Sequence, residues 1–258
     1  MTGPKRMRPE SAEADSELAI SYVVEPERRM SDLSLESAGS AVATGRRSAR
    51  GNWHSRPRIG IMGGTFDPIH NGHLQLARAF ADEIGLESVI FLHAGGPYHK
   101  EASAGGADAR VRLHMAELAV ADEPCFAVSD CDVVREGATY TFDTVQIFRQ
   151  HFPAAQLWWL MGMDSLMQLH KWKKWQTLVR HTHIAVAARE GENLAQAPRE
   201  LHGWLGEALQ QGSLKLLNAP MCNVSSTEIR RRARLGESLA GLVDRRVERY
   251  IEQNHLYR

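Results

Sequence analysis

From Arg58 onward the chain alternates short apolar runs with amphipathic stretches, and this alternation limits the folds open to it. We predict strands at residues 58–62, 88–92, 126–128, 156–161, 184–188 and 214–217, and helices over 72–84, 109–120 and 140–151, with further helices after the last strand. Strands and helices in this order predict an α/β fold, a Rossmann-like doubly wound parallel sheet with a C-terminal helical segment. In such sheets ligands bind at the carboxyl ends of the strands, near the switch in strand order.

The first 55 residues differ from the rest of the chain. They are rich in Ser, Ala, Glu and Arg and show little apolar periodicity. A segment of this composition cannot bury enough apolar surface to offset its conformational entropy. We therefore predict a disordered extension over 1–55 and a single folded domain over 56–258.

Charge and cysteine content narrow the classes of partner and compartment. Lys+Arg and Asp+Glu both number 31, so the formal net charge is zero. The chain thus lacks the overall positive charge that would indicate a nucleic-acid partner. Three cysteines without a CxxC pair fit a reducing compartment better than a disulfide framework or a zinc site. The chain contains no apolar run of the roughly 20 residues that a membrane-spanning helix needs. We expect a cytoplasmic protein, and a homo-oligomer is compatible with the sequence.

The segment from Gly63 to His73 carries the strongest chemical signal. It reads Gly63-Gly64-Thr65-Phe66-Asp67-Pro68-Ile69-His70-Asn71-Gly72-His73 and links the first predicted strand to the first predicted helix. Glycines allow a tight turn and a close approach of the backbone to a ligand. A helix N-terminus offers free amides to phosphate, and the two histidines, three residues apart, can donate hydrogen bonds or, when protonated, offset developing charge. Glycines and a histidine pair are common in purely structural roles, so the specificity lies in the whole string.

The string resembles the HxGH signature of the nucleotidyltransferase superfamily, which has the form GxFxPxHxGH in small members. Every fixed position of that pattern is present, at Gly64, Phe66, Pro68, His70, Gly72 and His73. In that superfamily the histidines contact ATP phosphates and stabilise the transition state. The absence of a Gly-Lys-[Ser/Thr] ending argues against a P-loop, and the spacing is not that of a GxGxxG dinucleotide loop.

A second motif, Asn223-Val224-Ser225-Ser226-Thr227-Glu228-Ile229-Arg230, stands near the C-terminus. Ser225 or Ser226 is a natural helix N-cap, and Glu228 lies at capping-box distance from Ser225. Free amides together with Arg230 would form a second anion site, although an isolated motif of this kind is more often a capped surface helix. The string resembles the ISSTxIR signature of the same superfamily, in which serine and arginine hold the triphosphate.

Two anion sites on one nucleotide suit transfer of an adenylyl group. A phosphate of the acceptor would attack the α-phosphorus of ATP and pyrophosphate would leave, with catalysis supplied by positioning and charge stabilisation. We expect Mg²⁺ to be bound mainly through substrate phosphates, because the sequence shows no dedicated set of carboxylate ligands for it.

Three further segments resemble those of bacterial nicotinate-nucleotide adenylyltransferases. They are Pro97-Tyr98-His99-Lys100, Thr139-Tyr140-Thr141 and Gly162-Met163-Asp164-Ser165-Leu166, the last followed by Trp172. Asn254-His255-Leu256-Tyr257 also resembles the end of that family's sequences. The resemblance covers 58–258 and implies transfer of AMP from ATP to nicotinate mononucleotide, giving nicotinate adenine dinucleotide and pyrophosphate in NAD biosynthesis. Tyr98 and Lys173 depart from the family pattern, where a second proline and an aromatic residue are common.

The resemblance implies a role for each matching residue. ATP would be bound by Gly63, Gly64, Thr65, Phe66, His70, His73, Ser225, Ser226, Thr227 and Arg230. Nicotinate mononucleotide would be bound by Lys100, Thr139, Tyr140, Thr141 and Trp172. The catalytic residues would be His70, His73 and Asp164. The alternatives are another small adenylyltransferase with a phosphopantetheine acceptor, a non-catalytic nucleotide sensor, and a fragment of a class I tRNA synthetase. The neutral net charge and the lack of a KMSKS-like string oppose the last of these.

Overall fold

The computed structural model describes residues 22–24, 28–29, 56–94, 106–135, 137–218, 222 and 224–258. Two short strands, β1 (Tyr22–Val24) and β2 (Arg28–Arg29), lie within the segment 1–55 that the sequence predicts to be disordered. The rest of that segment lies outside the described residues, so the division of the chain at residue 55 stays a prediction.

A single sheet of eight strands, in the order β2-β1-β5-β4-β3-β6-β7-β8, forms the centre of the described part of the chain. Six strands run parallel to one another: β3 (Arg58–Gly64), β4 (Ser88–His93), β5 (Phe126–Ser129), β6 (Gln156–Gly162), β7 (His183–Ala188) and β8 (Leu214–Asn218). β1 and β2 join antiparallel beside β5. The prediction of a doubly wound parallel sheet is confirmed, and all six predicted strands are present.

Strand order changes direction at β3. The chain adds β4 and β5 on one side of β3 and then crosses back to place β6, β7 and β8 on the other side. β3 pairs with both β4 and β6, so the carboxyl ends of β3 and β6 flank the crevice where doubly wound sheets bind ligands. The two predicted motif segments that end these strands, Gly63-Gly64 and Gly162, are therefore neighbours in space.

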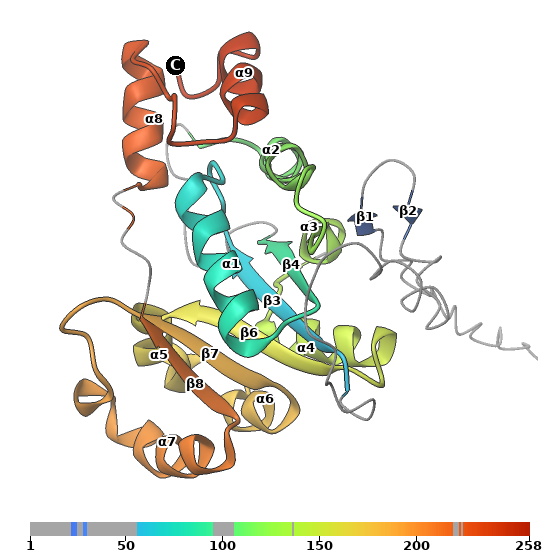
Figure 1. Ribbon diagram of the computed structural model, residues 1–258, viewed down its shortest axis with the longest axis vertical. Helices are drawn as coiled ribbons and strands as arrows, with labels where there is room; N and C mark the ends of the chain where they lie inside the picture. The colour runs from blue at the N-terminus through green and yellow to red at the C-terminus, as the bar shows by residue number, and fades with distance from the viewer. Residues whose placement is uncertain are drawn as a thin grey trace, which may run out of the picture.

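One face of the sheet is covered by α1 (Asn71–Ile84), α2 (Ala109–Val120), α8 (Ser226–Leu235) and α9 (Arg245–Gln253). The apolar residues of α1 recur at helical spacing, and Leu74, Ala77, Phe80 and Ile84 are buried against the strands. Figure 1 shows α8 and α9 beside α1 and α2, at the opposite end of the view from α6 and α7. The predicted helices over 72–84 and 109–120 are confirmed to within one residue.

The other face is covered by α4 (Thr141–His151), α5 (Met163–Gln168), α6 (Trp175–His181) and α7 (Arg199–Gln211). Two shorter elements join them, α3 (Cys131–Val134) after β5 and a 3₁₀ turn, η2 (Leu169–Lys171), after α5; a second 3₁₀ turn, η3 (Leu194–Gln196), precedes α7. Weak patterning over 189–212 leaves an exposed insertion or a loosely packed helix as the sequence-based prediction. The structure confirms a helix here, α7, and corrects its packing, because Leu201, Leu205 and Ala208 are buried in this core layer.

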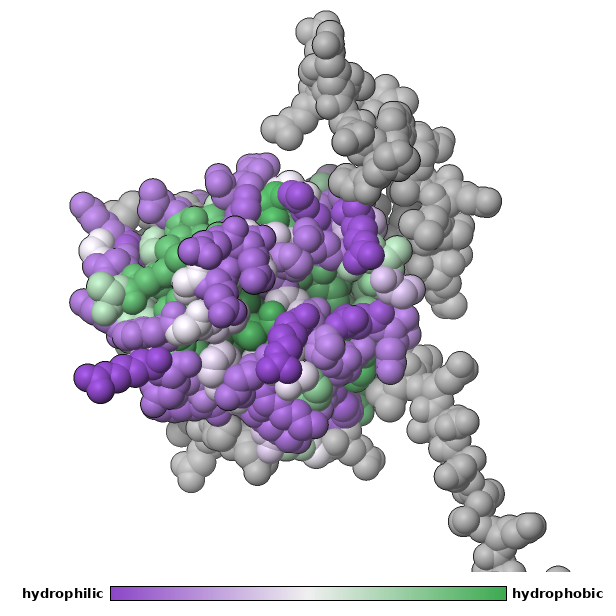
Figure 2. Space-filling model, turned by 90° about the horizontal axis from the view of Figure 1, so that it is seen from below, coloured by the Kyte–Doolittle hydropathy of each residue, from purple (hydrophilic) through white to green (hydrophobic). Residues whose placement is uncertain are grey.

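Successive side chains along a strand alternate between these two core layers. Trp158 belongs to the layer under α1, whereas Trp159 belongs to the layer under α5. The surface view in Figure 2 is dominated by hydrophilic side chains with smaller apolar areas between them. None of the helices in the described ranges is long and apolar enough to cross a membrane.

Candidate active site

A cavity of about 290 Å³ opens at the switch point, at the carboxyl ends of β3 and β6. Its walls come from both strands, from the loop before α4 and from the turn after α5. The lining includes Gly63, Gly64, Asp132, Thr139, Thr141, Trp159, Gly162, Ser165 and Trp172. Residues of the first motif's strand end, of the segment 139–141 and of the segment 162–172 thus meet where the topology predicts a ligand. His70, His73 and the described residues of the second motif do not line this cavity.

Gly63 and Gly64 are the last residues of β3 and not part of a turn, which corrects the role expected for them. Their need for glycine comes from neighbouring rings. A Cβ on Gly63 would lie 2.8 Å from the indole of Trp159, and a Cβ on Gly64 would lie 2.8 Å from the ring of Phe66. The absence of side chains here lets the strand end open directly into the cavity.

Two histidines stand at the start of α1 with their rings stacked. The ring centroids of His70 and His73 are 3.6 Å apart. The backbone N–H of His70 donates to Nδ1 of His73 at 3.2 Å, which makes Nδ1 an acceptor and places the ring proton on Nε2. A Cβ on Gly72 would come within 3.1 Å of the His70 ring, so the glycine of the motif makes room for this stack.

Both histidines are neutral in the ligand-free protein. Burial lowers the pKa of His70 to about 4, and burial together with the neighbouring imidazoles His70 and His93 lowers the pKa of His73 well below its usual range. Of the two roles expected for the histidines, hydrogen-bond donation is thus the one open to them in the ligand-free protein. A neutral His73 still offers its Nε2–H to a phosphate oxygen, and Nδ1 of His70 is buried without a hydrogen-bond partner among the described residues.

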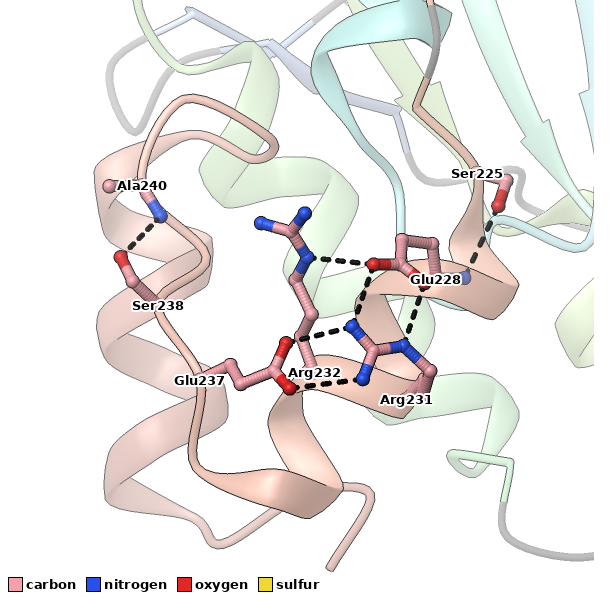
Figure 3. A network of polar contacts seen from close by, with 7 residues as sticks. All are labelled: Ser225, Glu228, Arg231, Arg232, Glu237, Ser238 and Ala240. Atoms are coloured by element: carbon pink, nitrogen blue, oxygen red, sulfur yellow. Dashed lines mark hydrogen bonds and ion pairs between the residues drawn. The ribbon is translucent and has the colours of Figure 1, made fainter.

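The second motif starts α8 as the sequence predicts. Ser225 is the N-cap, and its Oγ accepts from the backbone N–H of Glu228 at 3.2 Å. The Glu228 carboxylate turns to Arg231 and Arg232, and Arg231 also pairs with Glu237 (Figure 3). These arginine hydrogen bonds hold the pKa of Glu228 at about 2. Arg231 and Arg232 are thus engaged on the helix surface, which leaves Arg230 to face the first motif.

Side chains of the second motif bind the backbone of the first. Ser226 Oγ donates to the carbonyl of Pro68 at 2.9 Å, and Arg230 Nη1 donates to the carbonyl of Asp67 at 2.6 Å. Arg230 also reaches Oγ1 of Thr227 at 3.4 Å. The start of α8 is thereby fixed against the loop that precedes α1, and the two predicted phosphate-binding segments form one site.

Phe66 contributes to the site from within the core. It is buried, and its ring lies edge-on to the imidazole of His73 with the centroids 5.0 Å apart. Its predicted contact with ATP would therefore come from its backbone. Thr65 is exposed beside it.

On the opposite side of the cavity stand the residues predicted for the acceptor. Thr139, Thr141 and Trp172 line it, and Trp172 packs edge-on to Trp159 with ring centroids 6.3 Å apart. The ring of Tyr140 is instead covered by the ammonium group of Lys173, 4.0 Å from its centroid. Lys173, the residue that departs from the family pattern, thus packs on the predicted acceptor segment.

Asp164 lies in the first turn of α5 and is exposed. Its carboxylate folds back over Gly162, where an added Cβ would lie 2.6 Å from Oδ1. Gly162 and Ser165, on either side of Asp164 in the sequence, line the cavity, so Asp164 stands at its rim. The predicted site residue Lys100, together with Tyr98 of the same loop, lies outside the described residues.

Two buried charged residues of the site were missed by the sequence analysis. Arg112 of α2 donates to three carbonyl oxygens, those of Thr65, Ala94 and Ala107, and so ties the first motif to two other loops. Its position on the buried face of an amphipathic helix, in line with Met115 and Ala116, is a sequence signal that could have revealed it.

The second missed residue is Asp132, which lines the cavity. Its Oδ1 accepts from Thr144 Oγ1 at 2.8 Å and from Arg135 Nη2 at 2.9 Å. Burial raises its pKa, while Thr144 and Arg135 act in the opposite direction. Since Asp132 and Thr144 flank residues 139–141 in sequence, this cluster holds the predicted acceptor segment in place.

A larger hollow of about 870 Å³ lies at the other ends of the strands, where Leu157, Thr182 and Trp204 contribute to its walls. It contains none of the predicted site residues. The position of the site is therefore decided by the convergence of chemical groups at the switch point and not by volume.

Comparison with known proteins gives concordant results. Residues 61–232 match the family described as cytidylyltransferase-like. A protein of Neisseria meningitidis serogroup B, named a probable nicotinate-nucleotide adenylyltransferase, is 66% identical over 201 residues, which cover 78% of this chain and 98% of that relative. A protein of the same name from Yersinia pestis is 40% identical and covers 77% of this chain and 94% of that relative.

Among solved structures, the nicotinic acid mononucleotide adenylyltransferase of Plasmodium falciparum complexed with NaAD has the same fold. It aligns with a TM-score of 0.62 at 16% identity and covers 78% of this chain and 97% of that protein. A protein of Vibrio parahaemolyticus named a putative nicotinate-nucleotide adenylyltransferase aligns with a TM-score of 0.55 at 14% identity, over 78% of this chain and 96% of that one.

Proposed function

The chain belongs to the nicotinate-nucleotide adenylyltransferase family, and from that premise we propose which of its residues carry out the reaction. The enzyme is a nucleotidyltransferase of NAD biosynthesis that transfers AMP from ATP to nicotinate mononucleotide, giving nicotinate adenine dinucleotide and pyrophosphate. We propose that ATP lies across the start of α1 and the start of α8, and that the acceptor lies in the cavity beside Trp172.

The observation that carries this assignment is the bonding between the two motifs. Ser226 and Arg230 reach the carbonyls of Pro68 and Asp67 at 2.9 and 2.6 Å, so both predicted phosphate-binding segments are held together before a ligand arrives. Groups fixed in advance need little reorganisation when charge develops, which is the main source of catalysis in phosphoryl transfer.

In the proposed reaction a phosphate oxygen of the acceptor attacks the α-phosphorus of ATP, and the bond to the leaving pyrophosphate breaks. No covalent bond to the protein is formed. The Nε2–H of His73 donates to a phosphate oxygen, and the guanidinium of Arg230 balances the negative charge on the triphosphate. His70 stacks on His73 and holds its ring, and Asp164 stands beside the reacting centre.

On the acceptor side, we propose that the pyridine ring packs on Trp172, with hydroxyl and amide groups of Thr139 and Thr141 binding polar atoms of the same molecule. The support is their common place in the cavity wall. An indole edge and a flat heteroaromatic ring form a favourable pair. Tyr140 would support this segment through its contact with Lys173 and not by binding the acceptor directly.

We propose Mg²⁺ as the cofactor, bound through substrate phosphates and water. Among the described residues, three or more His, Cys, Asp or Glu side chains do not come together to hold a metal ion. The proposal rests on the chemistry of the substrate, because Mg²⁺ is commonly bound through one or two carboxylates together with substrate phosphates and water. When bound, it would neutralise charge on the phosphate oxygens. We also propose a cytoplasmic location, which the three free cysteines favour.

The test is pyrophosphate release from ATP and Mg²⁺ with nicotinate mononucleotide, with nicotinamide mononucleotide and with phosphopantetheine in parallel. We expect turnover that is fastest with nicotinate mononucleotide. Turnover with phosphopantetheine alone would support the alternative acceptor. ATP binding without turnover on any acceptor would support the alternative of a nucleotide sensor.

A further inference from the structure

The segment after α9 inserts a tyrosine into the first motif. Tyr257 is buried, and its hydroxyl donates to Oδ1 of Asp67 at 2.7 Å. His255 and Tyr257 have φ angles of 50° and 66°, in the left-handed region that non-glycine residues seldom adopt. Two such residues within three positions indicate that the surrounding contacts hold the chain in the bend that delivers this ring.

The loop that receives Tyr257 is itself held in an unfavourable conformation. Phe66 has a φ of 46°, in the left-handed region that a residue with a Cβ seldom adopts. Hydrogen bonds anchor the residues on both sides of it. The carbonyl of Thr65 accepts from Arg112, and that of Asp67 accepts from Arg230. The side chain of Asp67 accepts from Tyr257 and, at 3.1 Å, from the backbone N–H of Ala107.

A short path leads from this anchor to the proposed catalytic group. Asp67 directly follows Phe66, and the Phe66 ring lies edge-on to His73 at 5.0 Å. Any shift of the loop would move this ring and the imidazole that packs on it. The same loop carries the carbonyl oxygens that fix Ser226 and Arg230.

We propose that Tyr257 is a positioning residue for adenylyl transfer. Its hydroxyl fixes Asp67, Asp67 fixes the conformation of Phe66, and Phe66 sets the place of His73 relative to Arg230. Tyr257 does not touch substrate in this arrangement. The inference rests on the proposed roles of His73 and Arg230 and adds a residue from the opposite end of the described chain to the machinery.

The test is Tyr257→Phe, which removes the hydroxyl and keeps the buried ring. Tyr250→Phe is the matched control, because Tyr250 lies on α9 and its ring packs on His114 without reaching the motif. We expect kcat to fall about tenfold in Tyr257→Phe, the loss typical of one hydrogen bond to a charged group. We expect the KM for nicotinate mononucleotide to stay within about twofold, because the acceptor cavity is lined by other segments. Both variants are compared at equal folded fraction, measured by circular dichroism.

A double-mutant cycle with Asp67→Ala shows whether the hydroxyl acts through Asp67. If it does, Tyr257→Phe has less than about a twofold effect on kcat in the Asp67→Ala background. An equal effect in both backgrounds would overturn the proposal. So would a kcat for Tyr257→Phe equal to that of Tyr250→Phe, or a loss of activity explained by the unfolded fraction. Absence of turnover in the unmodified enzyme would instead contradict the proposed function.

Discussion

The nucleotide side and the acceptor side of the site are assembled in different ways. On the nucleotide side, Ser226 and Arg230 bind backbone atoms of residues 158 and 163 positions earlier in the chain. On the acceptor side, the cluster of Asp132, Arg135 and Thr144 spans only 12 positions. The first arrangement depends on the whole fold, whereas the second stiffens one loop.

This difference gives separable expectations for kinetics. Changes on the nucleotide side should lower kcat, because the groups there meet charge that develops in the transition state. Changes on the acceptor side should raise the KM for one substrate and leave the KM for ATP unchanged, since they remove binding that is equal in the ground and transition states.

The largest effect is expected for His73→Ala. The variant loses the Nε2–H proposed to meet the phosphate, and kcat should fall by roughly 10²–10³, as for loss of one oxyanion donor. His114→Ala is the control, because His114 is exposed on α2. Steady-state pyrophosphate release measures the kcat of both variants. A decrease of less than threefold in kcat would refute the catalytic role of His73 and remove the basis of the comparison.

The second prediction concerns the buried, neutral His93 on the nucleotide side and the pH dependence of stability that it causes. His93 is fully buried beside Phe66, neither ring nitrogen has a hydrogen-bond partner among the described residues, and burial lowers its pKa to about 3. In the unfolded chain histidine titrates near 6.5. Between these values the unfolded chain binds a proton that the folded protein excludes, so stability falls as the pH is lowered. For His93 alone the loss at pH 5 is about 2 kcal/mol.

Urea unfolding of His93→Phe and of the unmodified protein at pH 7 and pH 5 measures this loss. We expect the decrease in the free energy of unfolding between the two pH values to be smaller in His93→Phe by about 2 kcal/mol. The same pH dependence in His93→Phe as in the unmodified protein would show that His93 accepts a proton in the folded state.

Trp172→Ala tests the acceptor side directly. Loss of the indole should raise the KM for nicotinate mononucleotide about tenfold, the value of one aromatic contact together with the apolar area it buries. The KM for ATP should stay within about twofold. Trp175→Ala, on α6 where its ring packs against Trp204, is the matched control. A change confined to the KM for ATP would contradict the assignment of Trp172 to the acceptor side.

Features with a local sequence signal could be predicted, whereas contacts between distant segments could not. The strands, the helices and the N-cap at Ser225 follow from local apolar spacing and capping chemistry, and the structure confirms them to within a few residues. Arg112 and Tyr257 were not assigned roles, because their partners are backbone carbonyls or a carboxylate in a distant loop, and no local pattern records such a bond. The neutral state of His70 and His73 likewise depends on burial that only the assembled fold provides.

Asp132→Asn is expected to have the smallest effect and sharpens the comparison most. The amide oxygen can still accept from Thr144, but Arg135 loses its charged partner, so the loop over 139–141 should loosen and not collapse. If the acceptor loses about 1 kcal/mol of binding free energy, the KM for nicotinate mononucleotide should rise roughly fivefold. The kcat and the KM for ATP should stay unchanged. Asp122→Asn is the control, because it removes the carboxylate of another Asp–Arg pair, with Arg246, at an exposed position that does not line the cavity. If Asp132→Asn instead lowered kcat as strongly as His73→Ala, the acceptor loop would be part of the transition-state machinery, and the two sides of the site would act as one unit.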